Sequence, residues 1–329
     1  MKVDDFDLRE PGGALYTEFN EQFVRAEDDM AIKVLLTGAA GLVGRGVAQR
    51  LRNDRIDHIG VDVAGGKVDG FDVVQCDVRD IQRLHEIALR QKPTAVIHCG
   101  AYSGPMLGQD NPAAVIAVNV GGTANLLDLS RIHAIKRFIF CSSISAVGPT
   151  ASPIDENVVL GPTTVYGATK AACEHLVTAY RHAHGIETVC LRLHSVWGPN
   201  RTTACALGAM IKNAIANRET RMEAGGDAPT QYLHVDDAAD AIARALQAKT
   251  LPQPIYNIAG DRVIPLSEVA EIVRRVLPGA RITVGSGGNP LWEWQEEFRL
   301  GAAARDLGFT PRVKFEDGIR SFAQAAKAG

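Results

Sequence analysis

From Ile32 to about residue 195, short apolar runs alternate with longer stretches of helical periodicity. The apolar runs predict buried strands at "IKVLLTG", "HIGVDV", "AVIHCG", "RFIFCSS" and "TVCLRL". The stretches between them predict helices at "GRGVAQRLRN", "DIQRLHEIALRQ", "AVIAVNVGGTANLLDLSRIH" and "GATKAACEHLVTAYRHAHG". Strands that alternate with helices form a parallel sheet covered on both faces. The sequence therefore predicts an α/β fold with a Rossmann-type, doubly wound parallel sheet.

The alternation weakens after about residue 195, where Gly and Pro punctuate the chain, although "PIYNIAG" still predicts a late buried strand. We therefore expect a Rossmann domain over residues 31–192, with segments near 232–260 returning to it. Residues 193–329 are expected to form mainly a smaller C-terminal α/β substrate cap. Residues 1–30 carry nine acidic and three basic residues, and they predict an acidic arm that packs on the main body or on a second subunit.

Composition excludes several classes of function. The 329 residues include 35 basic and 38 acidic side chains, and this balance provides no basic surface for nucleic acid. The six cysteines contain no CxxC pair, so we expect neither a metal site nor a disulfide framework. No apolar run approaches the roughly 20 residues of a membrane span, and the N-terminus does not resemble a signal peptide. We expect a soluble, cytoplasmic protein with no membrane partner.

A glycine-rich loop, "VLLTGAAGLVGRG", joins the first predicted strand to the first predicted helix. Glycines at 38, 41 and 44 permit a tight turn and a close approach of the backbone to a pyrophosphate, which the helix N-terminus attracts. Asp62 ends the second predicted strand, close to the roughly 20 residues after the loop expected of a ribose-binding acid. Because a carboxylate there repels a 2′-phosphate, the pattern favours NAD over NADP.

Tyr166 and Lys170 lie four residues apart, one turn of a predicted helix. A tyrosine hydroxyl, with an ordinary pKa of about 10, transfers protons near neutral pH only if a nearby cation stabilises the phenolate. A lysine one turn away supplies such a charge. Ser142, Ser143 and Ser145 follow a predicted strand and should lie at the carboxyl edge of the sheet, where doubly wound folds bind ligands.

With these features the sequence resembles the extended short-chain dehydrogenase/reductases, specifically the NAD-dependent epimerase/dehydratase family. The resemblance runs from about Ile32 to near the C-terminus. The motifs that carry it are, in order, "TGAAGLVG", "CDVRD", "HCGA", "NVGGTANLL", "SSISAVG", "YGATK", "LRLHSVWGP", "YLHVDDAADAI" and "LGFTPRVKFEDGI". It implies a homodimer in which the helices predicted at 114–133 and 167–185 pair across a two-fold axis.

The resemblance also implies residue roles. Tyr166 would be the catalytic acid/base, Lys170 would stabilise its phenolate and hold the nicotinamide ribose, and Ser143 would bond the substrate oxygen. The implied cofactor-binding residues are Gly38, Gly41, Leu42, Val43, Gly44, Asp62, Asp77, Val78, Gly100, Ala101, Asn119, Tyr166, Lys170 and Leu193. The expected substrate-binding residues are Ser103, Ser143, Ser145, His194 and Arg201.

The chain departs from the family pattern where nucleotide-sugar enzymes hold the substrate diphosphate. Thr230 and Gln231 stand where those enzymes usually carry Arg-Asp, and Ser195 stands where an asparagine is common. A threonine cannot replace a bidentate arginine contact to phosphate. We therefore expect hydride transfer at a secondary alcohol of a sugar or sugar acid, without a nucleoside diphosphate. Two alternatives stay open: a nucleotide-sugar epimerase or dehydratase that recycles NAD in place, and a non-catalytic NAD-binding regulator.

Overall fold

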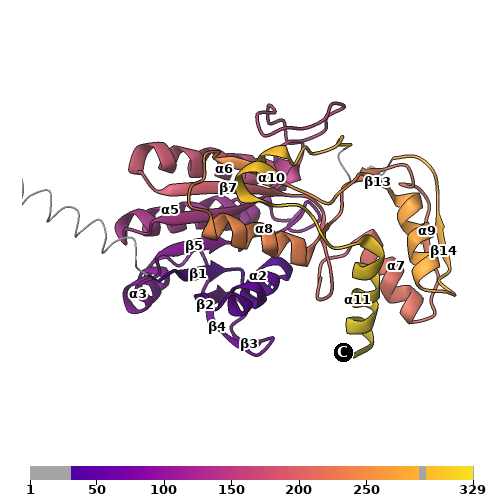
Figure 1. The fold of residues 1–329 in the computed structure, drawn as a ribbon, viewed down its shortest axis with the longest axis horizontal. Helices are drawn as coiled ribbons and strands as arrows, with labels where there is room; N and C mark the ends of the chain where they lie inside the picture. Colours follow the sequence, from indigo (N-terminus) through magenta and orange to yellow (C-terminus); the bar gives the residue numbers. More distant parts are fainter. Residues whose placement is uncertain (1–30, 289–293, 329) are drawn as a thin grey trace, which may run out of the picture. The chain divides into compact units, whose positions relative to one another are not determined.

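The structure, a computed structural model, describes residues 31–288 and 294–328. The predicted acidic arm, residues 1–30, lies outside the described residues. From Lys33 onward the chain forms one compact unit in which strands and helices alternate. The prediction of a doubly wound α/β fold is confirmed, as are all the strands and helices predicted before residue 195, within a few residues at their ends (Figure 1).

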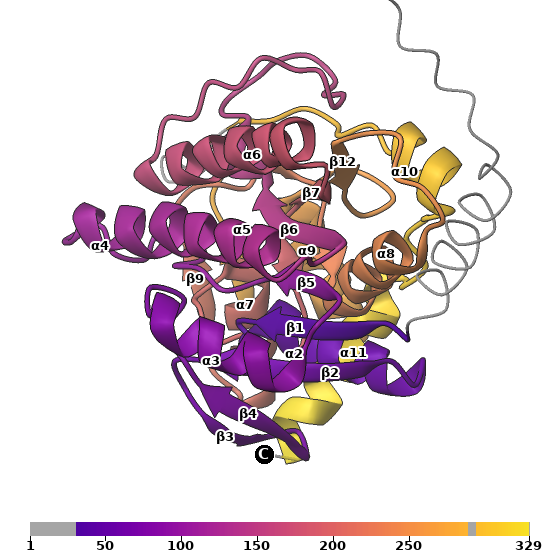
Figure 2. The same ribbon diagram turned by 90° about the vertical axis from the view of Figure 1, so that its left-hand side faces the viewer.

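The main sheet contains eight strands in the order β12-β7-β6-β5-β1-β2-β4-β3 (Figure 2). In chain order these strands are β1 (Lys33–Thr37), β2 (Asp57–Asp62), β3 (Gly66–Val68), β4 (Phe71–Gln75), β5 (Ala95–His98), β6 (Arg137–Ser143), β7 (Glu187–Leu193) and β12 (Ile255–Ile258). All neighbours are parallel except β3 and β4, which form an antiparallel hairpin that the sequence did not predict. Strand β1 lies between β2 and β5, so the strand order reverses there. In such sheets this reversal opens a ligand crevice at the carboxyl ends of the strands.

Two layers of helices cover the sheet. One face is covered by α2 (Leu42–Asn53), α8 (Val235–Gln247) and α10 (Gly301–Leu307), and the other by α3 (Ile81–Gln91), α5 (Gly122–Ile132) and α6 (Val165–His184). The apolar stripes of these helices pack on the strands from both sides, for example Leu51 on the first face and Leu126 on the second. Strands buried on both faces explain why the predicted runs are apolar throughout rather than alternating.

One helical stretch corrects the expectation that no segment is apolar enough to cross a membrane. Helix α4 (Pro112–Ile116), the π-helical turn η1 (Ala117–Gly121) and α5 form a continuous stretch, Pro112–Ile132, with a mean hydropathy of 1.3. By length and composition alone this stretch could cross a membrane, and it is the one such helix found among the described residues. In the structure it is a core helix, because Leu126, Leu127 and Leu129 pack fully buried in the layer beside α3 and α6.

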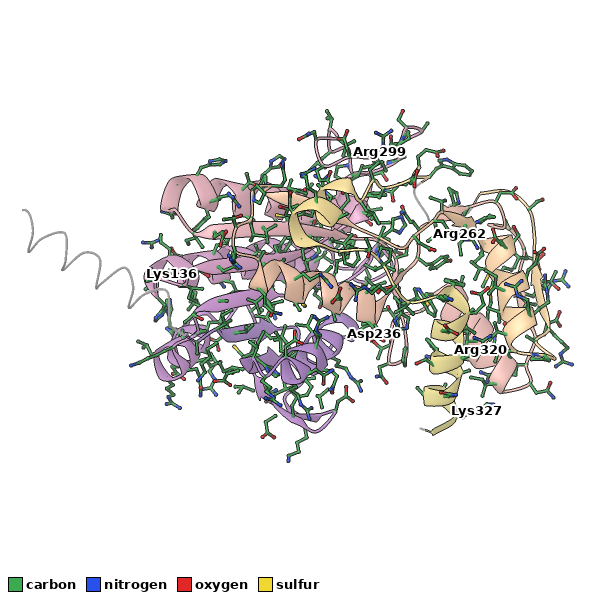
Figure 3. The ribbon with its side chains drawn as sticks, in the orientation of Figure 1. Lys136, Asp236, Arg262, Arg299, Arg320 and Lys327 are labelled. Carbon is green, nitrogen blue, oxygen red and sulfur yellow. The ribbon has the colours of Figure 1, made fainter. Side chains whose placement is uncertain are left out.

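The C-terminal part has its own hydrophobic core. Its elements are β8 (Val196–Trp197), α7 (Ala206–Ile215), β9 (Thr220–Met222), β10 (Pro229–Thr230), β11 (Leu233–His234), β13 (Ile264–Pro265), α9 (Leu266–Val276), β14 (Ile282–Val284) and α11 (Phe315–Ala328). Helices α7, α9 and α11 gather at one end in Figure 1, where Figure 3 labels Arg262, Arg320 and Lys327. Between these elements the chain returns to the sheet as α8 and β12. The boundary between the two predicted domains stays a prediction.

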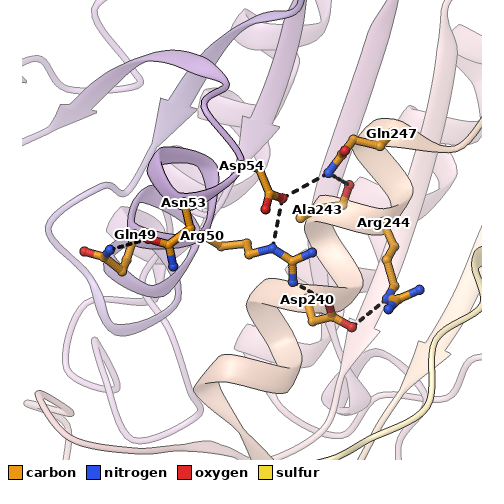
Figure 4. Close-up of polar contacts among 8 residues, drawn as sticks. All are labelled: Gln49, Arg50, Asn53, Asp54, Asp240, Ala243, Arg244 and Gln247. Carbon is orange, nitrogen blue, oxygen red and sulfur yellow. Dashed lines mark hydrogen bonds and ion pairs between the residues drawn. The ribbon is translucent and has the colours of Figure 1, made fainter.

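Helices α2 and α8 are joined by a polar network (Figure 4). Arg50 of α2 bonds to Asp54 at 2.9 Å and to Asp240 of α8, and Asp240 also accepts from Arg244 at 2.6 Å. Gln247 donates to Asp54 at 3.1 Å. The network fixes the position of α2 relative to α8. The first of these helices follows β1, and the second follows the first elements of the C-terminal part.

Candidate functional site

The glycine loop between β1 and α2 is held against the end of β5. Gly38 has a φ of 68°, and a Cβ on it would lie 2.6 Å from the backbone nitrogen of Gly100. A Cβ on Gly44 would lie 2.0 Å from the carbonyl oxygen of Gly38. Both positions therefore require glycine: the first has a positive φ, and the second packs closely against the backbone.

Asp62 stands at the carboxyl end of β2, beside this loop. Its Oδ2 accepts a hydrogen bond from the backbone of Ala40 at 3.1 Å, and its Oδ1 accepts from Ala64 at 3.0 Å. Further along the edge, hydrogen bonds from Arg79 lower the pKa of Asp77 and keep that carboxylate ionised at neutral pH. The two predicted acids thus lie on adjacent strand ends with defined orientations.

The serine turn follows β6. Ser143 ends the strand and caps the 3₁₀ turn η2 (Ile144–Ala146). Its Oγ accepts a hydrogen bond from the backbone nitrogen of Ser145 at 3.2 Å. Gln295 holds the turn from the other side, because its Nε2 donates to the carbonyls of Ile144 at 2.9 Å and Gly148 at 3.0 Å. The hydroxyl of Ser143 is therefore placed by both the sheet and a distant segment.

Helix α6 begins beside the serine turn. Thr164 caps it by accepting from the backbone nitrogen of Gly167 at 3.0 Å. A Cβ on Gly167 would lie 2.2 Å from the carbonyl oxygen of Ser145, so only glycine permits this approach. The contact brings Tyr166, which is 7% exposed, to the same edge of the sheet as Ser143.

Lys170 lies one turn further along α6 and is 4% exposed. Its Nζ donates to the carbonyl of Cys141 at 2.6 Å and stands 4.5 Å from the centre of the Phe140 ring. Within the described part of the chain, no carboxylate lies within ion-pair distance of this ammonium. Its charge is consequently not cancelled locally and acts on groups that enter the space beside Tyr166.

Glu174, a further turn along α6, forms a buried ion pair that the sequence analysis missed. Its carboxylate accepts from Arg192 of β7, with the closest contact at 2.8 Å, and from the Ser142 hydroxyl at 2.6 Å. The Glu174 and Arg192 side chains are each 1% exposed. A charged residue four positions after Lys170, on the buried face of an otherwise apolar helix stripe, was the signal that could have revealed the pair.

Asn119 lies in the π-helical turn, where its side chain joins two elements. Its Oδ1 accepts from the backbone nitrogen of Tyr102 at 2.8 Å, and its Nδ2 donates to the Thr169 hydroxyl at 3.0 Å. Asn119 therefore ties the segment after β5 to the helix that carries Tyr166. It does not line the cavity described next, unlike the other residues predicted to contact the cofactor.

A cavity of about 1490 Å³ runs along the carboxyl edge of the sheet and into the C-terminal part. The predicted residues that line it are Gly38, Gly41, Leu42, Val43, Gly44, Asp62, Asp77, Val78, Gly100, Ala101, Ser103, Ser143, Ser145, Tyr166, Lys170, Leu193, His194 and Arg201. Its volume exceeds the range of roughly 300–1,000 Å³ for ordinary small-molecule sites, which suits two ligands side by side.

The two ends of this cavity differ in charge. Asp62 and Asp77, at the end formed by β2 and β4, are its only acidic lining residues in the described part of the chain. At the other end, Arg201 donates to the backbone carbonyls of Val196 and Thr203, and Lys212 stands at the rim. Neither cation has a carboxylate partner among the described residues, so this end carries uncompensated positive charge.

His194 lines the cavity as a neutral side chain. It is 4% exposed, and burial lowers its pKa to about 3. Its Nδ1 accepts from the backbone nitrogen of Ser195 at 2.9 Å, so Nε2 carries the hydrogen. The imidazole is therefore a hydrogen-bond donor without charge.

Thr230 and Gln231 occupy different environments. Thr230 lines the cavity. The Gln231 side chain is 1% exposed and holds two segments together, since its Nε2 donates to the carbonyl of Gly260 at 2.9 Å and its Oε1 accepts from Phe298 at 2.9 Å. The side chain of Gln231 is thus fully used within the protein.

Comparison with known proteins agrees with the family resemblance seen in the sequence. Residues 34–259 match the model of the NAD dependent epimerase/dehydratase family. The UDP-glucose 4-epimerase of Streptomyces lividans is 30% identical over 75% of this chain and 82% of its own length. The crystal structure of Thermus thermophilus UDP-glucose 4-epimerase in complex with NAD superposes with a TM-score of 0.81, at 23% identity over 90% of this chain and 99% of that one. A partial consensus L-threonine 3-dehydrogenase reaches the same TM-score at 23% identity, over 90% and 100% of the two chains.

Proposed function

The chain belongs to the NAD dependent epimerase/dehydratase family, and from this premise we propose that it is an NAD-dependent oxidoreductase acting on a secondary alcohol of a sugar acid or sugar. NAD would supply the hydride acceptor in this proposal, and Tyr166 accepts the hydroxyl proton. The observation that carries the proposal is the meeting of Ser143, Tyr166 and Lys170 in one cavity that the glycine loop also lines.

The residues present fit NAD. Gly38 and Gly44 let the loop pack tightly against Gly100 and against its own backbone, and this loop, which lines the cavity, leads into the N-terminus of α2. A helix N-terminus and bare backbone suit a pyrophosphate. The Asp62 carboxylate lines the same end of the cavity and suits the hydroxyls of a ribose.

Side chains in the cavity can take up the proton that the alcohol loses. A substrate hydroxyl between Ser143 and Tyr166 would donate its proton to the tyrosine oxygen and accept a hydrogen bond from the serine. The buried Lys170 ammonium, held by the Cys141 carbonyl, favours the negatively charged phenolate that begins this step. The neutral His194 would orient a further substrate oxygen as a donor.

The charge of the cap end supports an acidic substrate. Arg201 and Lys212 are there without carboxylate partners in the described residues, and a substrate carboxylate would supply the missing charge. A nucleoside diphosphate would need the bidentate cation that nucleotide-sugar enzymes carry at the position of Thr230. Gln231 cannot contribute, because its side chain already bonds Gly260 and Phe298.

A second candidate is a nucleotide-sugar epimerase or dehydratase in which the hydride returns to the same molecule. It is favoured by the relatives named above, two of which are UDP-glucose 4-epimerases. In that case Arg201 and Lys212 would have to bind the diphosphate. A non-catalytic NAD-binding regulator is the least supported alternative, since Ser143, Tyr166 and Lys170 are all present.

One experiment separates these candidates. The protein is incubated with NAD and a panel of aldonates, uronates, aldoses and UDP- or dTDP-sugars, and NADH is followed by its absorbance. We expect net NADH from an unphosphorylated acid, and we expect Arg201→Gln to raise KM at least about tenfold for the acid but not for a neutral sugar. Isomerised nucleotide sugar without NADH, together with micromolar binding of UDP in calorimetry, would establish the second candidate instead.

A further inference from the structure

Cys99 and Cys141 lie side by side in the wall of the cavity. Cys99 directly follows β5, Cys141 lies in β6, and their Sγ atoms are 3.3 Å apart. The residues before them, His98 and Phe140, are direct partners in the parallel register. The two cysteines are therefore adjacent across strands about 4.8 Å apart, which lies within the roughly 4.4–6.8 Å range of Cα separations in disulfides.

The backbone of each cysteine is part of the site. The carbonyl of Cys141 accepts the hydrogen bond from Lys170. Cys99 precedes Gly100, and the backbone nitrogen of Gly100 packs closely on Gly38. A Cβ on Gly38 would lie only 2.6 Å from that nitrogen. A disulfide shortens the sulfur separation to about 2.05 Å. Because the strand separation already suits a disulfide, the bond forms chiefly by rotation of the two side chains. That rotation moves sulfur atoms that line the cavity, beside the glycine loop and beside the carbonyl that holds Lys170.

The closeness of the two sulfurs, rather than thiol acidity, suits the pair to oxidation. The hydrogen bond with Cys141 and burial raise the pKa of the Cys99 thiol, so little thiolate is present near neutral pH and its reaction with an oxidant is slow. Cys76 also lines the cavity, but its thiol donates to the Asp77 carbonyl rather than to a second sulfur. Cys76 therefore serves as a matched control: a thiol in the same cavity without a thiol partner.

We propose that Cys99 and Cys141 form a redox-sensitive dithiol, which a small peroxide converts to a disulfide that weakens cofactor binding. The effect on the cofactor rests on the proposed function of the cavity. In the first step one sulfur, after losing its proton, attacks a peroxide oxygen; the O–O bond breaks and water leaves. The second sulfur then attacks the resulting sulfenic acid, the S–O bond breaks and a second water leaves. Two thiols lose two electrons, and hydrogen peroxide gains them.

The test treats the full-length protein with hydrogen peroxide, with and without saturating NAD, and blocks the remaining thiols with N-ethylmaleimide. We expect a Cys99–Cys141 linked peptide by mass spectrometry, formed faster without NAD. Calorimetry of the treated protein should give NAD affinity at least about tenfold weaker, restored by dithiothreitol. In Cys99→Ser and Cys141→Ser, or the alanine variants if serine impairs folding, peroxide should leave the variant's own NAD affinity unchanged, whereas Cys76→Ser should respond like the wild type.

Three results would overturn the inference: no linked peptide in the wild type, equal NAD affinity before and after linkage, or a loss of affinity that depends on Cys76 alone. Failure of the proposed function is a separate result. It would be shown by untreated protein that binds no NAD, and in that case the linked peptide still decides whether the dithiol is oxidisable.

Discussion

At the scale of single residues, the site depends on backbone contacts that leave no room for a side chain. The spacing of Tyr166 and Lys170 and the position of the serines could be read from the sequence, because helical and sheet periodicity fix them. The role of Gly167 could not, since it depends on the Ser145 carbonyl, which folding brings to 2.2 Å from the glycine's missing Cβ. The same holds for Gln231, whose partners are far away in the chain.

The first prediction concerns Tyr166. Replacing it with phenylalanine removes the hydroxyl but keeps the ring that packs at the start of α6, so turnover should fall by roughly 10²–10⁴-fold while NAD affinity changes little. Steady-state kinetics and NAD calorimetry measure the two quantities. Tyr180→Phe, near the other end of the same helix, is the control and should keep its turnover. Near wild-type turnover in Tyr166→Phe would remove this residue from the mechanism.

The second prediction concerns cofactor choice. Asp62→Ala removes the carboxylate that Ala40 and Ala64 orient, so NAD should bind more weakly and NADP should bind relatively better. The ratio of the two dissociation constants is the measured quantity. Asp57→Ala, at the other end of β2, should leave the ratio unchanged. Equal affinity of the wild type for NAD and NADP would contradict the assignment of Asp62.

At the scale of helices and strands, the sequence predicted the Rossmann elements well because their strands are buried on both faces and their helices have one apolar stripe. It predicted few elements of the C-terminal part. Strands such as β8, β10, β11 and β13 have only two residues each and show no periodicity. Their pairings join segments distant in the chain, which a local pattern cannot indicate.

The third prediction concerns the anchor of helix α6. Because Arg192 and Glu174 are both buried, Glu174→Ala leaves a guanidinium without its counter-charge and should lower the free energy of unfolding by about 3–5 kcal/mol. Denaturant unfolding measures the change. Asp128→Ala breaks an exposed pair with Arg131 and should cost under about 1 kcal/mol. Similar effects of the two variants would show that the buried pair does not anchor the helix.

The fourth prediction concerns the α2–α8 network and pH. Burial raises the pKa of Asp240, but hydrogen bonds from Arg50 and Arg244 outweigh it and the pKa is lowered overall. A carboxyl with a lowered pKa in the folded state stabilises the protein above its unfolded pKa of about 3.9, and this contribution is lost as the pH falls through the folded pKa. The stability difference between wild type and Asp240→Asn should therefore be constant from about pH 5 to 8 and shrink below about pH 4. A constant difference at every pH would contradict this assignment.

At the scale of the whole molecule, the sequence predicted the class of fold and a ligand crevice at the edge of the sheet. How the cap and the sheet share the cavity could not be predicted, because residues such as Arg201, Gln295 and Phe322 reach it from separate segments. The homodimer implied by the family resemblance remains a prediction. Ile116 and Ile132, at the ends of the stretch expected to pair, are about half exposed, as Val165 is at the start of α6.

The fifth prediction tests this dimer. Light scattering at micromolar concentration should give twice the mass of the 35.2 kDa chain. Ile116→Lys places a charge on the expected interface and should shift the mass toward the monomer. Leu89→Lys is the control, because Leu89 is an exposed apolar residue of α3, which is not expected to pair. A monomeric wild type, or equal effects of the two lysines, would contradict the interface.

The position of β12 at the edge of the sheet has a consequence for biosynthesis. Its partner β7 is complete at Leu193, but β12 begins only at Ile255, after the first elements of the cap. While the ribosome makes that intervening segment, β7 presents an unpaired edge to other nascent chains and to chaperones. We expect the pairing of β12 with β7 to be the late, slow step of folding, because it joins distant parts of the chain. A chain arrested before β12 should be the form that aggregates.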